Sequence, residues 1–393
     1  MDTKTKDYLH INSKLKYFVF LCIYFLLYPI AKMLFGKMNK WLICERGIDA
    51  QDNGYAFYKY LLNEHKEIEP IYLIKKSSSD FEKVRDCGGK IVEFGSFKHF
   101  VMAIGCPIKI SSHLYGYAPW IQMALYFRRN KTRDKHVFLQ HGITKNDQPG
   151  FYKENCKSLS LFVCGAKPEY VYILNNFGYL NDTPQYTGFP RYDSLKNASE
   201  KNQILFMPTW RRNLKGLSLD SFKNTMFYIS WAKLLNDESL LSCCRLYHIN
   251  IKYYLHSSFQ LYSSLFTEND VVSIIKFEDE DVQTLLKDSK LLVTDFSSVY
   301  FDFAYMEKPM VFYQFDEDEY YKNHYSKGYF DYRTDGFGPV CINEETTVRE
   351  IMNLIKNNFV VNNEYLKRMK RTFIFSDSEN SKRVFESIQK ISN

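Results

Sequence analysis

The sequence lacks the short motifs that identify many nucleotide-, metal- and nucleic-acid-binding proteins. Its nine cysteines include no CxxC pair and no zinc-finger spacing, so we predict reduced thiols rather than disulfides or a metal site. No GxGxxG follows the first predicted strand and no GxxxxGK(S/T) is present, which argues against an NAD enzyme and a P-loop NTPase. No compact Lys/Arg-rich recognition helix is visible, so nucleic acid is not an expected partner.

The composition is that of a globular protein with more than one domain. The chain has 393 residues, 45% of them hydrophobic and 17% aromatic, and a net charge of +7. This length exceeds one ordinary hydrophobic core, so two domains are expected. The modest positive charge suits an anionic substrate or an anionic membrane face.

One apolar segment lies near the N-terminus. Residues 17–31 are almost unbroken in hydrophobicity, and the run reaches Phe35 if Lys32 extends toward the interface. The core of this run is shorter than the roughly 20 residues that span a bilayer, and Pro29 would kink it. We predict that residues 1–40 form a tail and a membrane-associating anchor, which holds the rest of the chain at the cytoplasmic face of the cell membrane. A buried core helix is the alternative.

Short apolar runs alternate with helical segments along the rest of the chain. Strands are predicted over residues 41–44, 71–74, 90–93, 108–112, 136–140, 160–164, 203–207, 250–255, 271–275, 291–294 and, as the last one, 308–313. Such alternation predicts βαβ units and parallel sheets. We therefore predict an α/β fold with two Rossmann-like domains, residues 41–198 and 199–393, joined by a polar linker over residues 196–202. The acidic run 316–319 is expected to be a solvated loop.

Polar residues follow several of these strands, and parallel sheets bind ligands at the carboxyl ends of their strands. His141 and Gly142 come directly after strand 136–140. A histidine titrates near neutral pH and can take a proton from an attacking hydroxyl, and glycine allows close approach of a ligand. The pair is a candidate catalytic site, although a single histidine at a strand end is often structural.

The second half carries three candidate phosphate-binding features. Arg211 follows strand 203–207 and its guanidinium could bind phosphate oxygens bidentately, or it could be a solvated charge. His256 follows the next strand. After strand 291–294 the chain turns into a predicted helix near Ser297 and Ser298, where backbone N–H groups, the helix dipole and two hydroxyls could hold phosphate. An ordinary capped turn is the alternative for this last feature.

Several motifs occur in a fixed order between about residues 138 and 339. They are Gln140-His141-Gly142, residues 187–193, 206–211, Leu255-His256, 293–304, 308–313, 328–332 and Gly338-Pro339. Taken together, the chain resembles the CDP-glycerol glycerophosphotransferase family, which includes teichoic-acid primases and polymerases of Gram-positive bacteria. The resemblance implies a GT-B fold and transfer of polyol phosphate from CDP-glycerol, or another CDP-polyol, to a lipid-linked glycan or polymer acceptor. CMP would be released, in synthesis of a wall or capsule polymer.

The resemblance also implies roles for individual residues. His141 would deprotonate the acceptor hydroxyl and His256 would be the second catalytic residue. Substrate-binding roles would fall to Gly142, Arg191, Thr209, Arg211, Thr294, Asp295, Ser297 and Ser298. Asp295 is expected to orient its turn, because a carboxylate would repel phosphate. No cofactor and no metal cluster are expected, although a divalent cation near the pyrophosphate remains an open alternative.

Some alternatives stay open at this point. The residues around His141, with Gln140 before it and Ile143 two positions after it, differ from those of many polymerases, so primase and polymerase activity are both compatible with the sequence. The absence of a large extra N-terminal domain favours transfer of one or a few units. A GT-B glycosyltransferase that uses a nucleotide sugar would share the architecture, and a non-catalytic membrane-bound scaffold would tolerate loss of His141.

Overall fold

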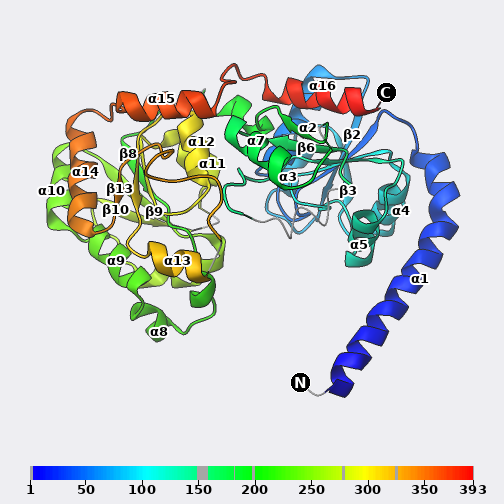
Figure 1. Ribbon diagram of the computed structural model, residues 1–393, viewed down its shortest axis with the longest axis horizontal. Coiled ribbons are helices and arrows are strands. Elements are labelled where there is room, and N and C mark those ends of the chain that lie inside the picture. The colour runs from blue at the N-terminus through cyan, green and yellow to red at the C-terminus, as the bar shows by residue number, and fades with distance from the viewer. Residues whose placement is uncertain are drawn as a thin grey trace.

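The computed structural model describes residues 3–147, 158–180, 182–196, 200–276, 279–323 and 326–392, with side chains described from Lys14 onward. Two α/β halves lie side by side, and a long N-terminal helix projects from the first half (Figure 1). Each half contains one parallel sheet.

The first half is built on a seven-stranded sheet in the order β3-β2-β1-β4-β5-β6-β7. All its pairs are parallel. The strands are β1 (Lys40–Cys44), β2 (Glu69–Ile74), β3 (Lys90–Glu93), β4 (Ile108–Ser111), β5 (Lys135–Phe138), β6 (Leu161–Cys164) and β7 (Pro184–Tyr186). The six strands predicted here are present, and β7 is an addition, because three residues are too few to produce a clear pattern.

The second half is built on a six-stranded parallel sheet in the order β10-β9-β8-β11-β12-β13. The strands are β8 (Gln203–Phe206), β9 (Asn250–Tyr254), β10 (Val272–Ile275), β11 (Leu291–Thr294), β12 (Met310–Tyr313) and β13 (Val340–Cys341). Counted within each half, the first six strands of both sheets follow the order 3-2-1-4-5-6, which is the Rossmann order. The expectation that strand 308–313 is the last was wrong, because β13 pairs beyond it.

Helices cover the sheets, and many begin at side-chain caps. Asp52 and Ser96, for example, accept backbone N–H bonds at the starts of α2 and α4, as N-cap residues do. The helices of the first half are α2 (Asn53–Glu64), α3 (Phe81–Arg85), α4 (Phe97–Gly105), α5 (Ile121–Arg129), α7 (Lys167–Asn176) and η1 (Pro190–Ser194). Those of the second half are η2 (Arg212–Leu214), α8 (Leu219–Lys223), α9 (Met226–Leu235), α10 (Glu238–Leu246), η3 (Ser257–Leu265), α11 (Val282–Asp288), α12 (Val299–Tyr305), α13 (Glu317–Asn323), α14 (Glu344–Lys356) and α15 (Asn363–Thr372).

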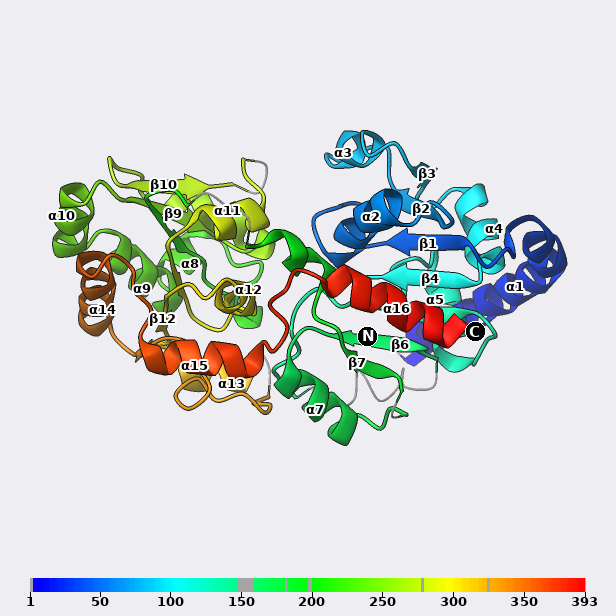
Figure 2. The ribbon, with the colours of Figure 1, turned by 90° about the horizontal axis from the view of Figure 1, so that it is seen from above.

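The C-terminal helix α16 (Asn380–Ser392) returns to the first half (Figure 2). It contacts α2, β5, β6 and η1. The Asp193 carboxylate accepts hydrogen bonds from the backbone N–H groups of Asn380 and Ser381, both at 2.8 Å, which fixes the start of the helix. The predicted domain boundary between residues 198 and 199 lies in a segment, 197–199, outside the described residues, so that division of the chain stays a prediction.

Helix α1 (Thr3–Phe35) is continuous through Pro29. Its stretch Lys14–Phe35 is, among the helices described, the one long and apolar enough to cross a membrane by length and composition. One side packs on α4 and α5 and buries Phe20, Tyr24 and Ala31. Lys32 does not extend toward an interface; its ammonium pairs with the buried Asp134 carboxylate.

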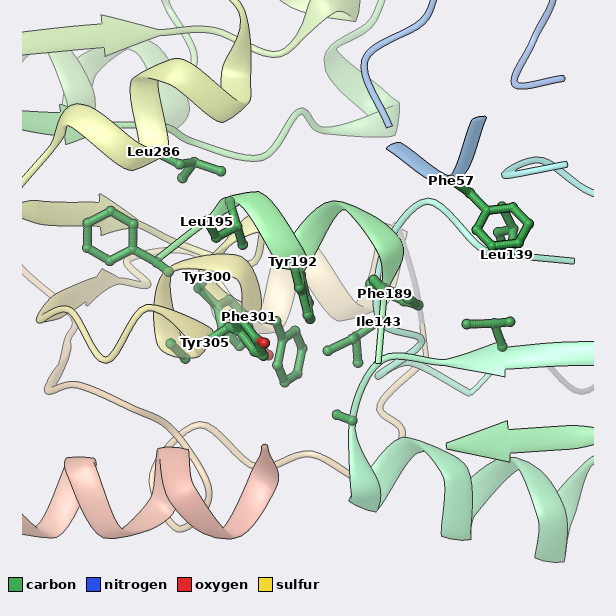
Figure 3. Packing of buried hydrophobic residues seen from close by; sticks show 14 of the residues in the cluster. Phe57, Leu139, Ile143, Phe189, Tyr192, Leu195, Leu286, Tyr300, Phe301 and Tyr305 are labelled. Atoms are coloured by element: carbon green, nitrogen blue, oxygen red, sulfur yellow. The ribbon is translucent and has the colours of Figure 1, made fainter. Parts of the chain in front are cut away.

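One apolar cluster contains residues of both halves (Figure 3). It joins residues of the first half, such as Phe57, Ile143 and Tyr192, to residues of the second half, such as Leu286 and Tyr300. Because side chains in such a core are close-packed, the cluster sets the position of one sheet relative to the other. The loops that follow the strands of the two sheets therefore face one another in a defined arrangement.

Candidate active site

A cavity of about 270 Å³ lies between the two halves. Its walls contain His113, His141 and Arg191 from the first half and His256 and Ser298 from the second. These residues follow the carboxyl ends of their strands, where parallel sheets bind ligands. His113 and Ser298 follow β4 and β11, the strands at which the order reverses in each sheet. Of the ten predicted site residues, His141, Arg191, His256 and Ser298 are brought to this cavity.

Hydrogen bonds to neighbouring segments hold the loop that carries His141 in place. Gln140 has a left-handed backbone conformation with φ of 60°, and its side-chain amide donates to Val163 O at 2.7 Å and to Glu169 at 3.0 Å. The Asn53 amide donates to Gln140 O at 2.8 Å. Because the carbonyl and the side chain of Gln140 are both hydrogen-bonded, the backbone from which the His141 imidazole extends is held in place.

Gly142 brings this loop close to the turn before α12 in the second half. A Cβ at this position would lie 3.1 Å from Ser298 Oγ. This is tighter than an ordinary contact, so a larger residue here would require the Ser298 side chain to shift.

The His141 imidazole is suited to act as a base. It donates one hydrogen bond to the carbonyl of Ser112, which leaves the other ring nitrogen to accept a proton. The ring is accessible from the cavity, but the enclosing walls desolvate it and the Arg191 guanidinium lies nearby, so its pKa is lowered from the usual value. Both effects disfavour the charged form. His141 is therefore an unprotonated base at neutral pH.

His256 faces the cavity as a neutral hydrogen-bond donor. Its Nδ1 accepts from Ser258 N–H at 3.1 Å, so the ring proton is assigned to Nε2. Desolvation, followed by the charges of Arg46 and Lys215, lowers the pKa of His256 to about 4. The ring also stacks on Trp210, with 6.0 Å between centroids. An oriented N–H donor of this kind can bind a phosphate oxygen.

Arg191 connects the two halves across the cavity wall. Its Nε and Nη2 donate to the Asp302 carboxylate of α12, both at 2.8 Å, and its Nη1 donates to Asp52 at 2.9 Å. These carboxylates raise the pKa of Arg191 above its usual range, against the effect of desolvation. The resemblance implied a substrate-binding arginine; in this structure most of its donors are already used by two acidic side chains. Arg191 therefore links α12 to the start of α2 through two ion pairs.

Arg211 lies behind the turn and does not line the cavity. Its guanidinium bonds Asp316 at 2.7 and 2.9 Å and Asp295 at 2.8 Å, and its side chain is 3% exposed. The geometry therefore does not support the expected phosphate contact from Arg211, because its donors are directed at buried carboxylates. The role of Arg211 in substrate binding stays a prediction. The expectation of a solvated acidic loop at residues 316–319 was wrong, since the Asp316 side chain is buried in this pair and α13 begins at Glu317.

The other predicted residues of the second half form the turn itself. Asp295 accepts from Thr209 N–H at 2.8 Å and from Phe296 N–H at 2.5 Å. Thr294 Oγ1 donates to Met207 O at 2.7 Å, and Ser297 Oγ accepts from Val299 N–H at 3.4 Å. These bonds join the ends of β8 and β11 and leave Ser298 as the turn residue that lines the cavity.

Replacing Arg211 with lysine is expected to weaken this turn. Lysine keeps the charge but lacks the planar fork, so at least one buried carboxylate oxygen loses its partner. The free energy of unfolding should fall by about 1–3 kcal/mol, measured by chemical denaturation. The exposed neighbour Arg212, changed to lysine, is the matched control, and an equal effect of both substitutions would contradict the role of Arg211.

Lys145 is a buried residue of the first half that reaches into the second. Its Nζ donates to Phe296 O at 2.8 Å and to the Tyr332 hydroxyl, and it lies 5.4 Å from the centroid of the Tyr300 ring. Burial lowers the pKa of Lys145 to about 7, although Asp295 opposes this shift. The side chain therefore links the His141 loop to the turn at Asp295.

The lowered pKa of Lys145 has a measurable consequence. The unfolded chain binds a proton at this residue up to about pH 10.5 and the folded chain only up to about pH 7, so the free energy of unfolding of the wild type should rise with pH between these values. The free energy of unfolding of the wild type, minus that of Lys145→Met, should therefore rise by at most about 1.4 kcal/mol per pH unit between pH 7 and 9. Denaturation at several pH values tests this, with the exposed Lys66→Met as the control. A pH-independent difference would contradict it.

Sequence reasoning missed His113 and Asp302, which line the cavity, and Lys145, which is bonded to the turn at Phe296. His113 follows β4 as directly as His141 follows β5, so the same rule would have identified it. Lys145 and Asp302 carry no comparable signal, because their partners come from the other half of the chain. Within the described residues, no group of three or more His, Cys, Asp or Glu side chains is arranged to hold a metal ion.

Two sheets in Rossmann order, with the ends of their strands facing one cavity, define the GT-B class of two-domain proteins. The family model of CDP-Glycerol:Poly(glycerophosphate) glycerophosphotransferase matches residues 27–390. The chain therefore belongs to this family.

Curated relatives act in teichoic acid synthesis, according to their names. The chain is 32% identical over 372 residues to the Minor teichoic acid biosynthesis protein GgaB of Bacillus subtilis strain 168, which covers 92% of this chain and 41% of the relative. It is 26% identical to the Teichoic acid glycerol-phosphate transferase of Staphylococcus aureus strain NCTC 8325 / PS 47, over 63% of this chain and 64% of the relative. The chain thus spans less than two thirds of the length of these relatives.

Solved structures confirm the predicted fold. The Wall Teichoic Acid Polymerase TagF superposes with a TM-score of 0.67 at 16% identity, covering 97% of both chains. The S. aureus MnaA-UDP co-structure superposes with a TM-score of 0.57 at 13% identity, covering 89% of this chain and 96% of the other. At these identities the likeness shows the fold alone, which is the α/β GT-B arrangement.

Proposed function

We propose that the protein transfers glycerol phosphate from CDP-glycerol to a membrane-linked glycan or polymer acceptor and releases CMP, in synthesis of a teichoic-acid-like or capsular polymer. The observation that carries this proposal is that His141 and His256 line one cavity between the two halves. Family membership supports CDP-glycerol as the donor, and the name of the Staphylococcus aureus relative supports transfer of glycerol phosphate.

The proposed reaction is an in-line phosphoryl transfer. The free nitrogen of His141 takes the proton of the acceptor hydroxyl, and the oxygen attacks the phosphorus that carries the glycerol. A new P–O bond forms, the bond from this phosphorus to the bridging oxygen breaks, and CMP leaves with that oxygen. His256 Nε2–H and the Ser298 hydroxyl, on the opposite wall, bind phosphate oxygens and stabilise the charge that develops on them.

Membrane attachment through α1 is a further part of this proposal. The side of α1 that does not pack on the first half exposes apolar residues, including Phe25, Leu26 and Met33, and lysines lie at both ends of the apolar stretch. Such a surface suits the membrane boundary, where a lipid-linked acceptor would be found. The eight cysteines of the described residues are free thiols, which supports the cytoplasmic face.

The proposal is tested by incubating the detergent-solubilised protein with membrane lipids and either CDP-glycerol, CDP-ribitol or a UDP-sugar. We expect CMP release from CDP-glycerol and incorporation of labelled glycerol into the lipid fraction. CMP release from CDP-ribitol alone would reassign the polyol. Release of UDP from a nucleotide sugar, without CMP from either CDP-polyol, would overturn the proposal in favour of a glycosyltransferase.

A further inference from the structure

Arg46 is a cation on the cavity wall to which the proposed reaction gives no role. It follows β1 of the first half and lines the same cavity as His141 and His256. Its side chain is 48% exposed, so a ligand in the cavity can reach the guanidinium. Among the described residues that line this cavity, the arginines are Arg46 and Arg191, and no lysine accompanies them. The permanent positive charge of the cavity therefore comes from these two side chains.

The two arginines differ in the N–H groups that they leave for a ligand. Arg191 bonds Asp302 through Nε and Nη2 and Asp52 through Nη1, and its side chain is 6% exposed. Arg46 donates from Nε to Asp49 Oδ2 at 2.7 Å and from Nη2 to the same oxygen. Its Nη1, which carries two N–H groups, bonds to no other residue in the described part of the chain. Arg46 is therefore the arginine of this cavity that can still bind an anion.

The ion pair with Asp49 fixes the direction of this free group. Nε and Nη2 form one edge of the planar guanidinium, so Nη1 points away from the carboxylate that holds that edge. The loop itself is bonded to the region of β2: Lys75 N–H donates to Gly47 O at 2.8 Å, and the Tyr72 hydroxyl donates to Asp49 O at 3.3 Å. Asp49 is therefore a positioning residue for the guanidinium of Arg46.

The other carboxylates of the cavity are held by donors of the protein. Asp52 and Asp302 accept from Arg191. Glu45 accepts from three backbone N–H groups around the start of α2, at 2.9, 2.9 and 2.8 Å. Because their oxygens are directed at these donors, the three carboxylates do not compete with a ligand for Arg46 Nη1.

The charge of Arg46 acts on histidines of both walls. Desolvation lowers the pKa of His256 to about 4, and Arg46 is the largest of the charges that add to this effect. Desolvation and Arg191 lower the pKa of His141, and Arg46 contributes further. A cation that affects both rings lies close to the space between them. An anion bound in this space would be attracted by Arg46 and would offset its repulsion of the protonated rings.

We propose that Arg46 binds, through Nη1, an oxygen of the phosphoryl group that the enzyme transfers, and is a further catalytic residue. In the proposed reaction the phosphorus lies next to the hydroxyl that His141 deprotonates, and its oxygens lie next to His256. A guanidinium at this place stabilises the negative charge that develops on the phosphoryl oxygens. The first half would then contribute to donor binding as well as to the base. This inference rests on the proposed function.

The test compares two ligands that differ in the transferred group. CDP-glycerol contains the glycerol-bearing phosphoryl group, and CMP lacks it. Calorimetry with the full chain measures the affinity for each, and CMP release with membrane lipids gives kcat. Arg46→Ala removes the guanidinium, and Arg46→Lys keeps a charge without the fork. Arg85→Ala is the matched control, because Arg85 belongs to the same half, is 60% exposed and pairs with Glu82 three residues away.

We expect Arg46→Ala to bind CDP-glycerol about 10- to 100-fold more weakly, as loss of a charged hydrogen bond predicts, and to bind CMP as the wild type does. Its kcat should fall by about 100- to 1,000-fold. Arg46→Lys should keep part of the affinity for CDP-glycerol, and Arg85→Ala should match the wild type in all three measurements. Thermal unfolding shows whether each variant is folded. If Arg46→Ala does not fold, Arg46→Lys is compared with the wild type for both ligands and decides.

Two outcomes would overturn the inference while leaving the proposed function intact. Unchanged affinity of Arg46→Ala for CDP-glycerol is the first, and a fall in turnover alongside it would assign Arg46 to a phosphate of the acceptor. Equal weakening of CDP-glycerol and CMP binding is the second, because it would show a contact to the cytidine-bearing phosphate or a general loss of charge. Absence of CDP-glycerol binding and of CMP release in the wild type would instead contradict the proposed function.

Discussion

Replacing His141 with glutamine is expected to lower kcat for CMP release by about 100- to 10,000-fold, which is the usual contribution of a general base. Glutamine can keep the hydrogen bond to the Ser112 carbonyl through its amide but cannot accept the acceptor proton. Binding of CDP-glycerol, measured by calorimetry, should change little, because His141 is not one of the proposed phosphate contacts. Loss of turnover with retained donor binding would identify His141 as the base.

The matched control for His141 is His248→Asn. His248 is exposed on the second half and has φ of 53°, a conformation that asparagine tolerates. This variant should keep wild-type turnover. The pH dependence of kcat/KM adds an independent check: because the pKa of His141 is lowered, activity should persist as the pH falls to 6.5 and decline only below it. An acid limb above pH 6.5, or an active His141→Gln, would show that another group is the base.

Replacing Arg191 with methionine is expected to lower the free energy of unfolding by about 3–5 kcal/mol, because it leaves a buried carboxylate without its partner. Asp302 is 7% exposed, so water cannot replace both guanidinium bonds. Activity should fall as well, since Arg191 joins α12 to the start of α2 beside the cavity. Chemical denaturation of the purified protein measures the loss of stability.

A double variant separates the charge from the packing at this site. Arg191→Met combined with Asp302→Leu removes both charges, and such replacements of buried pairs often recover most of the lost stability. The control is Arg245→Met, which breaks the ion pair with Asp270 that lies on the surface and should cause a much smaller change. If the Arg191 and Arg245 variants are equally stable, the buried ion pair between Arg191 and Asp302 does not hold the two halves together.

The local pattern of the sequence determined the order of elements and the place of the cavity. Apolar runs that are buried on both sides of a parallel sheet are visible without knowledge of the partner strand, so the strand before His141 and the strand before Asp295 could be predicted. Because ligands bind at the carboxyl ends of such strands, His141 and His256 could be identified as candidates. The motifs also led to the family that the comparison confirmed.

Only the tertiary structure decided which polar residues face the cavity and which hold the scaffold. Arg211 and Arg191 were both predicted to bind substrate, but their carboxylate partners Asp295 and Asp302 lie 84 and 111 residues further along the chain. The fold determines which acceptors lie near a guanidinium, and therefore whether its N–H groups bond to the protein or can bond to a ligand. The same is true of Lys145, because its partners Phe296 and Tyr332 are distant in sequence and only the fold brings them near.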